Sequence, residues 1–178
     1  MLSFRLLRIH PSGNTGSWWA AALRVTIVLA PAALAEEMMC RGYLLSVLME
    51  GVGTRAGVVL TSLLFGLLHL LNADATAESL LVVVVAGVFL ACVRLMLNSL
   101  YAAWMAHFAW NWIMAVPMHA PVSGIRFEAP GYFADPSGPA WASGGQWGPE
   151  GGVVAGLGLS LALGYLYTLH ARRRREES

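Results

Sequence analysis

Long apolar stretches separated by short polar segments run along almost the whole chain. A helix that rises about 1.5 Å per residue needs about 20 apolar residues to cross about 30 Å of hydrocarbon. We therefore predict an all-α fold, a polytopic transmembrane helix bundle of about five helices. The stretches that meet or approach this length are Trp18 to Met49, Thr54 to Leu71, Leu80 to Leu97, Leu100 to Val116 and Gly151 to His170.

The first apolar stretch is longer than one crossing requires, and it contains Pro31. Because proline removes a helical hydrogen bond, we expect a kink near Pro31 or a partly re-entrant segment. Residues 1–17 are mixed in character and predict an N-terminal surface lead-in or a short interfacial helix. Trp18 and Trp19 then mark the membrane interface, where indole rings accumulate.

The remaining chain divides into one core domain, residues 18–170, and a basic C-terminal tail, residues 171–178. Within the core, residues 118–150 hold five of the eight prolines of the chain and many glycines. This composition predicts a long loop. Loops longer than about 12 to 15 residues are more often functional or disordered than idle connections.

Composition supports a membrane location. Hydrophobic residues make up 57% of the chain and charged residues 12%, with a mean hydropathy of +0.62. The hydrophobic share is higher, and the charged share lower, than in typical soluble domains. A net charge of +1 argues against a nucleic-acid partner. Cys40 and Cys92 lie in apolar stretches without a C-x-x-C motif, so we expect free thiols.

Two adjacent carboxylates and an arginine interrupt the first apolar stretch in the segment Glu36 to Arg41. Charged residues cost about 2.5 to 3.5 kcal/mol each at membrane depth, so they persist mainly when they are paired or functional. Glu37 and Arg41 share one helix face and can pair, whereas Glu36 points about 100° away. The alternative is that both glutamates only bridge Arg41 and an arginine of another helix, such as Arg24 or Arg94.

Two further apolar helices carry polar side chains. The segment Phe65 to His69 adds an imidazole, and the segment His107 to Asn111 adds an imidazole and an amide. Four residues make about 400° of helical turn, so His107 and Asn111 project from one face and can address one ligand. Three helices that each offer polar groups favour a shared interior site, with Trp110 as a packing or cavity-wall residue.

Other polar residues are expected to play lesser roles. His10 and His119 lie in expected loops and His170 adjoins the arginine run, so we expect all three to be solvated or interfacial. Asn98 is the best candidate for a residue that supports the site from outside it.

The motifs E-E-x-x-x-R, F-x-x-x-H and H-x-x-x-N, in this order on successive apolar helices, resemble the CPBP family of intramembrane proteases. That family groups CAAX prenyl endopeptidases with bacteriocin-processing and bacteriocin-immunity proteins. The resemblance covers residues 18–117, and the segment Gly148 to Gly152 is also similar to bacterial members. Members usually have further transmembrane helices before the first motif, whereas 35 residues precede Glu36 here. A reduced core or a truncated start is therefore expected.

The resemblance implies a role for each site residue. Glu36 and His69 would activate water, while His107 and Asn111 would hold the carbonyl oxygen as it becomes an oxyanion. Arg41, paired with Glu37, would orient the helix and tune Glu36. A carboxylate in a dry cavity is a stronger base, and fixed donors there favour developing negative charge. The substrate would be a membrane-associated peptide or protein, either prenylated CAAX-type or carrying a leader peptide.

A metal-dependent alternative remains open. Glu36, His69 and His107 also match the donor types of a three-ligand zinc site with an open position, and family members have been described as metalloendopeptidases on that ground. However, the sequence has no H-E-x-x-H motif, and Asn111 beside His107 suits an oxyanion donor better than a ligand. We therefore favour chemistry without a cofactor and keep Zn²⁺ as the alternative.

Two further function classes remain as rivals to the protease. The first is a non-enzymatic membrane binding protein resembling the bacteriocin-immunity proteins, which would keep the fold and use the polar cluster to bind. The second is a small transporter subunit that uses the glutamates as proton carriers.

The arginines predict an orientation in the membrane. All eleven basic residues are arginine, and four form the run Arg172 to Arg175. Since arginines near span ends favour the cytoplasm, we expect an integral protein of a bacterial cytoplasmic membrane with a cytoplasmic C-terminus. The 72–79 turn, the 118–150 loop and the cavity would then face outward. Arg5 and Arg8 also favour a cytoplasmic start, which conflicts with a single crossing by the first stretch.

Overall fold

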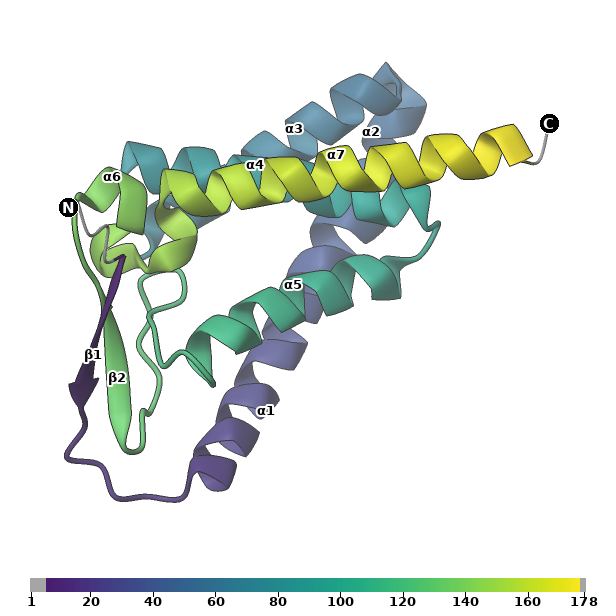
Figure 1. Cartoon of the computed structure of the whole chain (residues 1–178). Coiled ribbons are helices and arrows are strands. Elements are labelled where there is room, and N and C mark those ends of the chain that lie inside the picture. Colours follow the sequence, from purple (N-terminus) through teal and green to yellow (C-terminus); the bar gives the residue numbers. More distant parts are fainter. Residues whose placement is uncertain (1–5, 177–178) are drawn as a thin grey trace.

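Helices dominate the computed structural model, which describes residues 6–176 (Figure 1). The prediction of an all-α helix bundle is confirmed. The long elements are α1 (Trp18–Glu37), a π-helix (Met38–Leu44), α2 (Leu45–Val52), α3 (Thr54–Leu68), α4 (Ala77–Met96), α5 (Leu100–Ala115) and α7 (Val153–Glu176). The short elements are β1 (Leu7–Pro11), β2 (Tyr132–Pro136), α6 (Ala140–Ser143) and the 3₁₀ turns His69–Leu71, Gly145–Trp147 and Pro149–Gly151.

Four helical segments in the described part of the chain are long and apolar enough to cross a membrane. They are Trp18–Val52, Thr54–Leu71, Ala77–Met96 and Val153–Arg172. The helix α5 has 16 residues and spans about 24 Å, which is short of the hydrocarbon thickness. It is therefore not among these four segments, although it is one of the about five helices that the hydrophobic pattern predicted.

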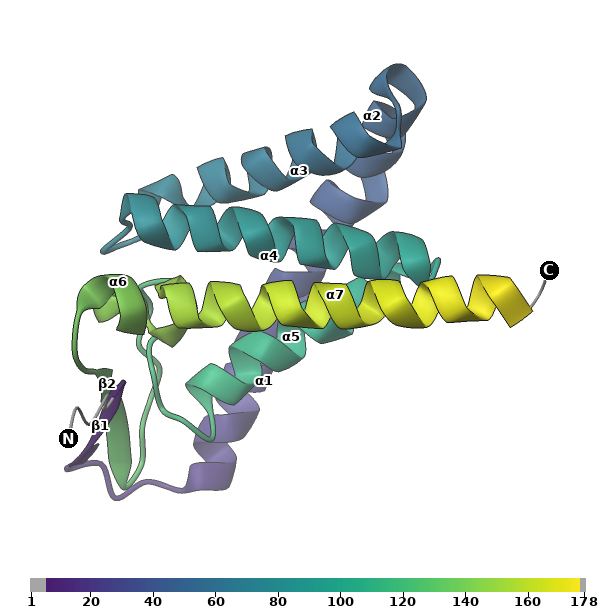
Figure 2. The same cartoon turned by 45° about the horizontal axis from the view of Figure 1, so that its top comes forward.

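The helix α4 lies at the centre of the bundle. It packs against α3 on one side, α7 on another and α5 on a third, and α1 packs mainly on α5. Figures 1 and 2 both show α4 and α7 side by side, with α1 and α5 crossing beneath them. Apolar side chains of α7 remain outside the protein core, including Leu157, Leu161 and Tyr165. This exposure matches a helix that faces lipid.

The first apolar stretch crosses the bundle without turning back. Pro31 lies inside α1, which continues to Glu37, and the helical segment runs on to Val52. The re-entrant alternative is therefore wrong. The departure from α-helical geometry lies at the π-helix, directly after the paired glutamates. Such π segments are rare and occur often at functional sites.

The N-terminal lead-in contains a strand, so the predicted interfacial helix is wrong for residues 7–11. β1 pairs antiparallel with β2, with Ile9 opposite Ala134. The partner strand comes far later in the chain, which is why local sequence did not reveal the pairing. The pairing holds the lead-in and the 118–150 segment together at the end of the molecule opposite the C-terminus (Figure 1). Arg8 therefore lies on the same side as this segment, and Arg5 lies outside the described residues.

The predicted 118–150 loop is a packed structure that contains β2, α6 and 3₁₀ turns. Trp147 is fully buried and packs in one cluster with Cys40, Phe65 and Val83. Gly148 has a φ of 119°, and a Cβ there would lie 2.2 Å from the Pro121 carbonyl oxygen. The segment is thus pinned to the helices that carry the polar motifs.

Small residues bring α3 and α4 close together. A Cβ at Gly87 of α4 would lie 3.0 Å from both Cα and Cβ of Ser62 on α3. Close backbone approach through small residues is the usual means of packing helices in membranes. The carbonyl of Gly87 also accepts a hydrogen bond from Arg41, so this contact supports the polar site.

We predict that Gly87→Ala destabilises the folded protein by about 1 to 3 kcal/mol, because the added methyl group overpacks a contact with backbone. Thermal unfolding in detergent micelles measures this effect. Gly158→Ala is the matched control, since a Cβ at Gly158 of α7 meets nothing within 4 Å. Equal unfolding temperatures for the two variants would contradict the close α3–α4 contact.

Candidate active site

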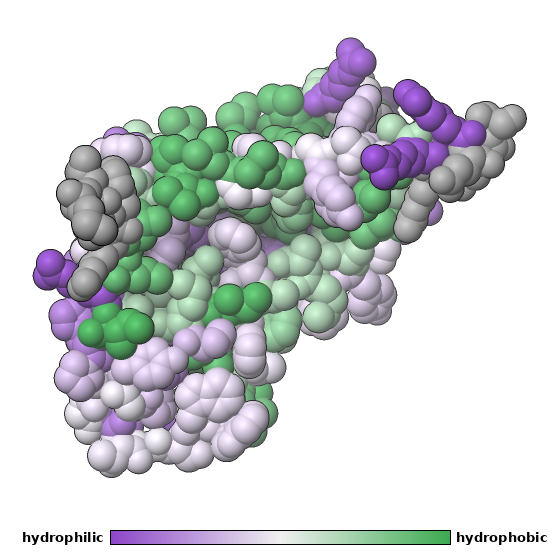
Figure 3. Space-filling view, in the orientation of Figure 1, coloured by the Kyte–Doolittle hydropathy of each residue, from purple (hydrophilic) through white to green (hydrophobic). Residues whose placement is uncertain are grey.

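A cavity of about 70 Å³ lies where α5 faces α3 and α4. α7 and the segment that precedes it also contribute to its lining, and Figure 3 shows the surface hollowed between the α4 and α7 layer and α5. Three of the predicted site residues line it, namely His69, His107 and Asn111. The other lining residues are Phe65, Val82, Val83, Ala86, Phe89, Leu90, Ala106, Trp110, Ser123, Glu150 and Leu159.

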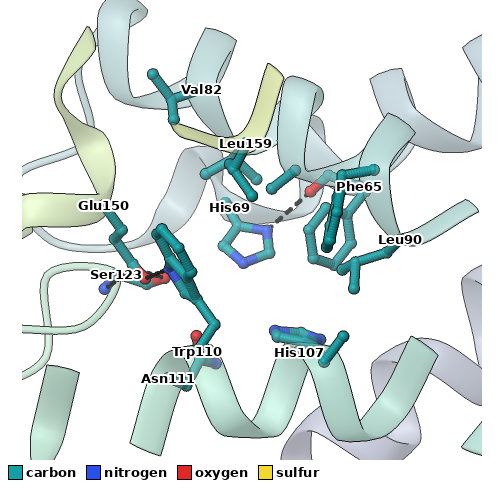
Figure 4. A pocket seen from close by; sticks show the side chains of 14 residues that line it. Phe65, His69, Val82, Leu90, His107, Trp110, Asn111, Ser123, Glu150 and Leu159 are labelled. Atoms are coloured by element: carbon teal, nitrogen blue, oxygen red, sulfur yellow. Dashed lines mark hydrogen bonds between the residues drawn. The ribbon is translucent and has the colours of Figure 1, made fainter. Parts of the chain in front are cut away.

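His69 reaches the cavity from the 3₁₀ turn that follows α3. Its Nδ1 lies 2.8 Å from the carbonyl oxygen of Phe65. A carbonyl only accepts, so Nδ1 carries the proton, and Nε2 of the neutral ring is an acceptor. Figure 4 shows this second nitrogen turned into the cavity.

His107 is held by a buried ion pair. Its Nδ1 lies 2.9 Å from Glu37 Oε1, and the same oxygen accepts a hydrogen bond of 2.9 Å from Arg41 Nη1. The side chains of Glu37 and Arg41 are fully buried. The predicted pairing of Glu37 with Arg41 is present, and it extends to the imidazole on α5.

Phe65 connects the three charged or imidazole groups through its ring. The Arg41 guanidinium carbon lies 4.2 Å from the ring centroid, a cation–π arrangement. The centroids of His69 and His107 lie 4.7 Å and 5.7 Å from it. The aromatic residue of the F-x-x-x-H motif thus contacts Arg41 and both cavity histidines.

Glu36 lies beside this cavity and is not one of its lining residues. Its Oε2 is 3.9 Å from His107 Nε2, beyond hydrogen-bond distance. This oxygen is buried and has no hydrogen-bond partner among the described residues. Glu36 and Glu37 therefore approach opposite nitrogens of one imidazole, as the turn between adjacent helical residues predicts.

Arg24 and Arg94 do not take part in this network. Arg24 pairs with Glu128 at the surface, and Arg94 donates to Asn98 Oδ1 at 3.3 Å. The alternative in which both glutamates only bridge arginines of different helices is therefore wrong. His119 also differs from its predicted solvated state, since it is buried and its Nδ1 lies 2.7 Å from the Tyr132 carbonyl oxygen.

Glu150 is a cavity carboxylate that the sequence motifs did not identify. It is 8% exposed. Its Oε1 accepts hydrogen bonds from the Ser123 amide at 2.6 Å and the Ser123 hydroxyl at 2.8 Å. Its Oε2 accepts one from Trp110 Nε1 at 3.2 Å. Burial raises the pKa of the Glu150 carboxyl, and the hydrogen bonds from Ser123 oppose that rise. The sequence signals were an acid just before the last apolar stretch and the resemblance of its segment, Gly148 to Gly152, to bacterial family members.

The arrangement does not form a ready three-ligand metal site. Among residues 6–176, no three His, Cys, Asp or Glu side chains lie close enough together to hold a metal ion. The candidate ligands Glu36, His69 and His107 are therefore not gathered around one point. The residues do not fit the alternative Zn²⁺ site in this conformation.

Comparison with family models gives one match. A model described as type II CAAX prenyl endopeptidase Rce1-like matches residues 17–113. The matched range contains all six residues of the predicted site and ends before Ser123 and Glu150. Comparison with curated proteins and with solved structures gives no match.

We predict that Glu37→Gln costs about 3 to 5 kcal/mol of folding stability, because it leaves Arg41 as a buried charge without its counterion. Glu36→Gln is the matched control, since Glu36 is partly exposed and its Oε2 has no hydrogen-bond partner in the described structure. Thermal unfolding in detergent checks both variants. A Glu37→Gln protein as stable as the control would refute the structural role of the ion pair.

Proposed function

The chain belongs to the Rce1-like family of type II CAAX prenyl endopeptidases, and we propose that it hydrolyses a peptide bond by glutamate-dependent chemistry. Membership supports an intramembrane endopeptidase in general. The observation that carries the finer proposal is the meeting of two imidazoles and an amide in one cavity, with Glu36 beside His107. The proposed substrate is a peptide or protein at the membrane, either prenylated CAAX-type or carrying a leader.

In the proposed reaction Glu36 is the general base. Its Oε2 is buried and lacks a hydrogen-bond partner in the described chain, so it is available to accept a proton from water. His69 Nε2 is an acceptor that points into the cavity and can orient the same water. Water oxygen bonds to the carbonyl carbon as its proton passes to Glu36. The Glu36 carboxyl then delivers that proton to the amine nitrogen as the C–N bond breaks.

Asn111 and His107 are proposed to stabilise the oxyanion. The Asn111 side chain has no hydrogen-bond partner within the described structure, so its N–H groups are available to the substrate oxygen. Because His107 Nδ1 donates to Glu37, Nε2 donates only when the ring carries both protons. The proposed oxyanion role therefore requires an imidazolium.

We propose that the cavity opens to the outer face of the membrane and that the C-terminus is cytoplasmic. The start of α3, the end of α4 and the end of α7 lie toward the end of the bundle at which the chain terminates (Figure 1). In the sequence these helix ends carry Arg55, Arg94 and the run from Arg172. The β1–β2 pair and the 118–150 segment lie at the other end. Arginines at one end of a bundle favour its cytoplasmic location.

We predict that Glu36→Gln lowers kcat at least about 100-fold with little loss of folded protein, because the amide cannot accept the proton of water. Cleavage of a peptide library by purified protein, with and without a chelator, measures the effect and the metal dependence together. Glu78→Gln, at an exposed position in the first turn of α4, is the control. Full activity of the Glu36→Gln variant would exclude this mechanism. A biological phenotype that survives without turnover would favour the immunity-like binding protein.

We predict that a green fluorescent protein fused after Ser178 is fluorescent and that alkaline phosphatase fused there is inactive. The first reporter folds in the cytoplasm and the second is active outside it, so the pair controls for expression. An active phosphatase fusion without fluorescence would reverse the proposed orientation.

A further inference from the structure

Glu150 is the buried carboxylate of the cavity to which the proposed reaction gives no role. It comes from a segment outside the matched family region, yet it lines the same cavity as the two histidines. Three protein donors converge on it, from the 118–150 segment and from α5. A carboxylate with so many donors is better suited to fix its neighbours than to transfer a proton.

Three tryptophans of α5 donate indole hydrogen bonds in two directions. Two of the bonds, each 2.9 Å long, hold α5 against α1, and their pairs are Trp104 with the Ala30 carbonyl and Trp112 with Thr26 Oγ1. The third bond, from Trp110, runs to Glu150 on the opposite side of the cavity. Among the described residues, it is the indole bond that ties α5 to the segment leading into α7.

The hydrogen bond between Trp110 and Glu150 lies next to a residue of the proposed catalytic site. Trp110 precedes Asn111 in sequence, and both line the cavity. Figure 4 shows the Trp110 ring between α5 and Glu150. The other oxygen of Glu150 holds the backbone and hydroxyl of Ser123, which close the same side of the cavity. Glu150 thus joins α5 and the loop after α5 to the start of α7.

We propose that Glu150 is a positioning residue that sets the distance between Asn111 on α5 and the cavity wall formed by α4 and α7. This inference rests on the proposed protease function. The cavity is small, and a misplacement of about 1 Å in a catalytic group can cost about 100-fold in rate. A bond that fixes the separation of its walls therefore controls turnover more than substrate binding.

The test is a double-mutant cycle on kcat with Glu150→Gln and Trp110→Phe. The amide of the first variant keeps an oxygen for Ser123 and presents N–H groups to the Trp110 indole, so that one bond is lost. The second variant removes the indole donor and leaves Glu150 intact. We expect each change alone to lower kcat about 10- to 100-fold with much less change in KM. The double variant should lose little more than either single variant.

Two substitutions in the same segment are matched controls. Glu128→Gln alters an exposed carboxylate that pairs with Arg24 at the surface, and Trp141→Phe alters an exposed tryptophan of α6. Both should keep kcat. Unchanged kcat in the Glu150→Gln variant, or fully additive losses in the cycle, would overturn the positioning role. Absence of cleavage by the unmodified protein would instead overturn the proposed function on which the role depends.

Discussion

The buried charge of Glu37 is the constraint on which the rest of the site depends. An ionised carboxylate far from water must be compensated by opposite charge and hydrogen bonds. Here the charge comes from the next turn of the same helical run and the second contact from α5. Arg41 supplies the charge and His107 the second contact, while Arg41 continues to the carbonyl of Gly87 on α4. The contacts of Glu37 and Arg41 therefore connect α1 and the π-helix to both α5 and α4.

The same constraint explains the packing around the site. Arg41 reaches α4 because Gly87 has no side chain and Ser62 of α3 is small, which lets the helices approach closely. The Phe65 ring packs against the Arg41 guanidinium and also contacts the ring of His69, which lines the cavity. The polar motifs and the small residues of α3 and α4 therefore pack against one another at the site.

Sequence pattern predicted the helices and the helix face of each motif, because helical periodicity is a local property. It correctly indicated that Glu37 pairs with Arg41 and that His107 and Asn111 share a face. It did not reveal β1, whose partner strand lies beyond five helices, nor the π-helix, which changes the turn directly after Glu37. Glu150 was also missed, because its burial arises from Ser123 and Trp110, which no spacing rule connects to it.

The order of the elements along the chain has a consequence for biosynthesis. Every residue of the three family motifs precedes Ser123, yet the cavity also requires Ser123, Glu150 and Leu159. During translation the motif helices emerge first, and β1 cannot pair with β2 until after α5 has been made. Non-local pairing of this kind forms late in folding. A nascent chain thus carries the motif residues into the bundle before the later segments that complete the cavity lining have been made.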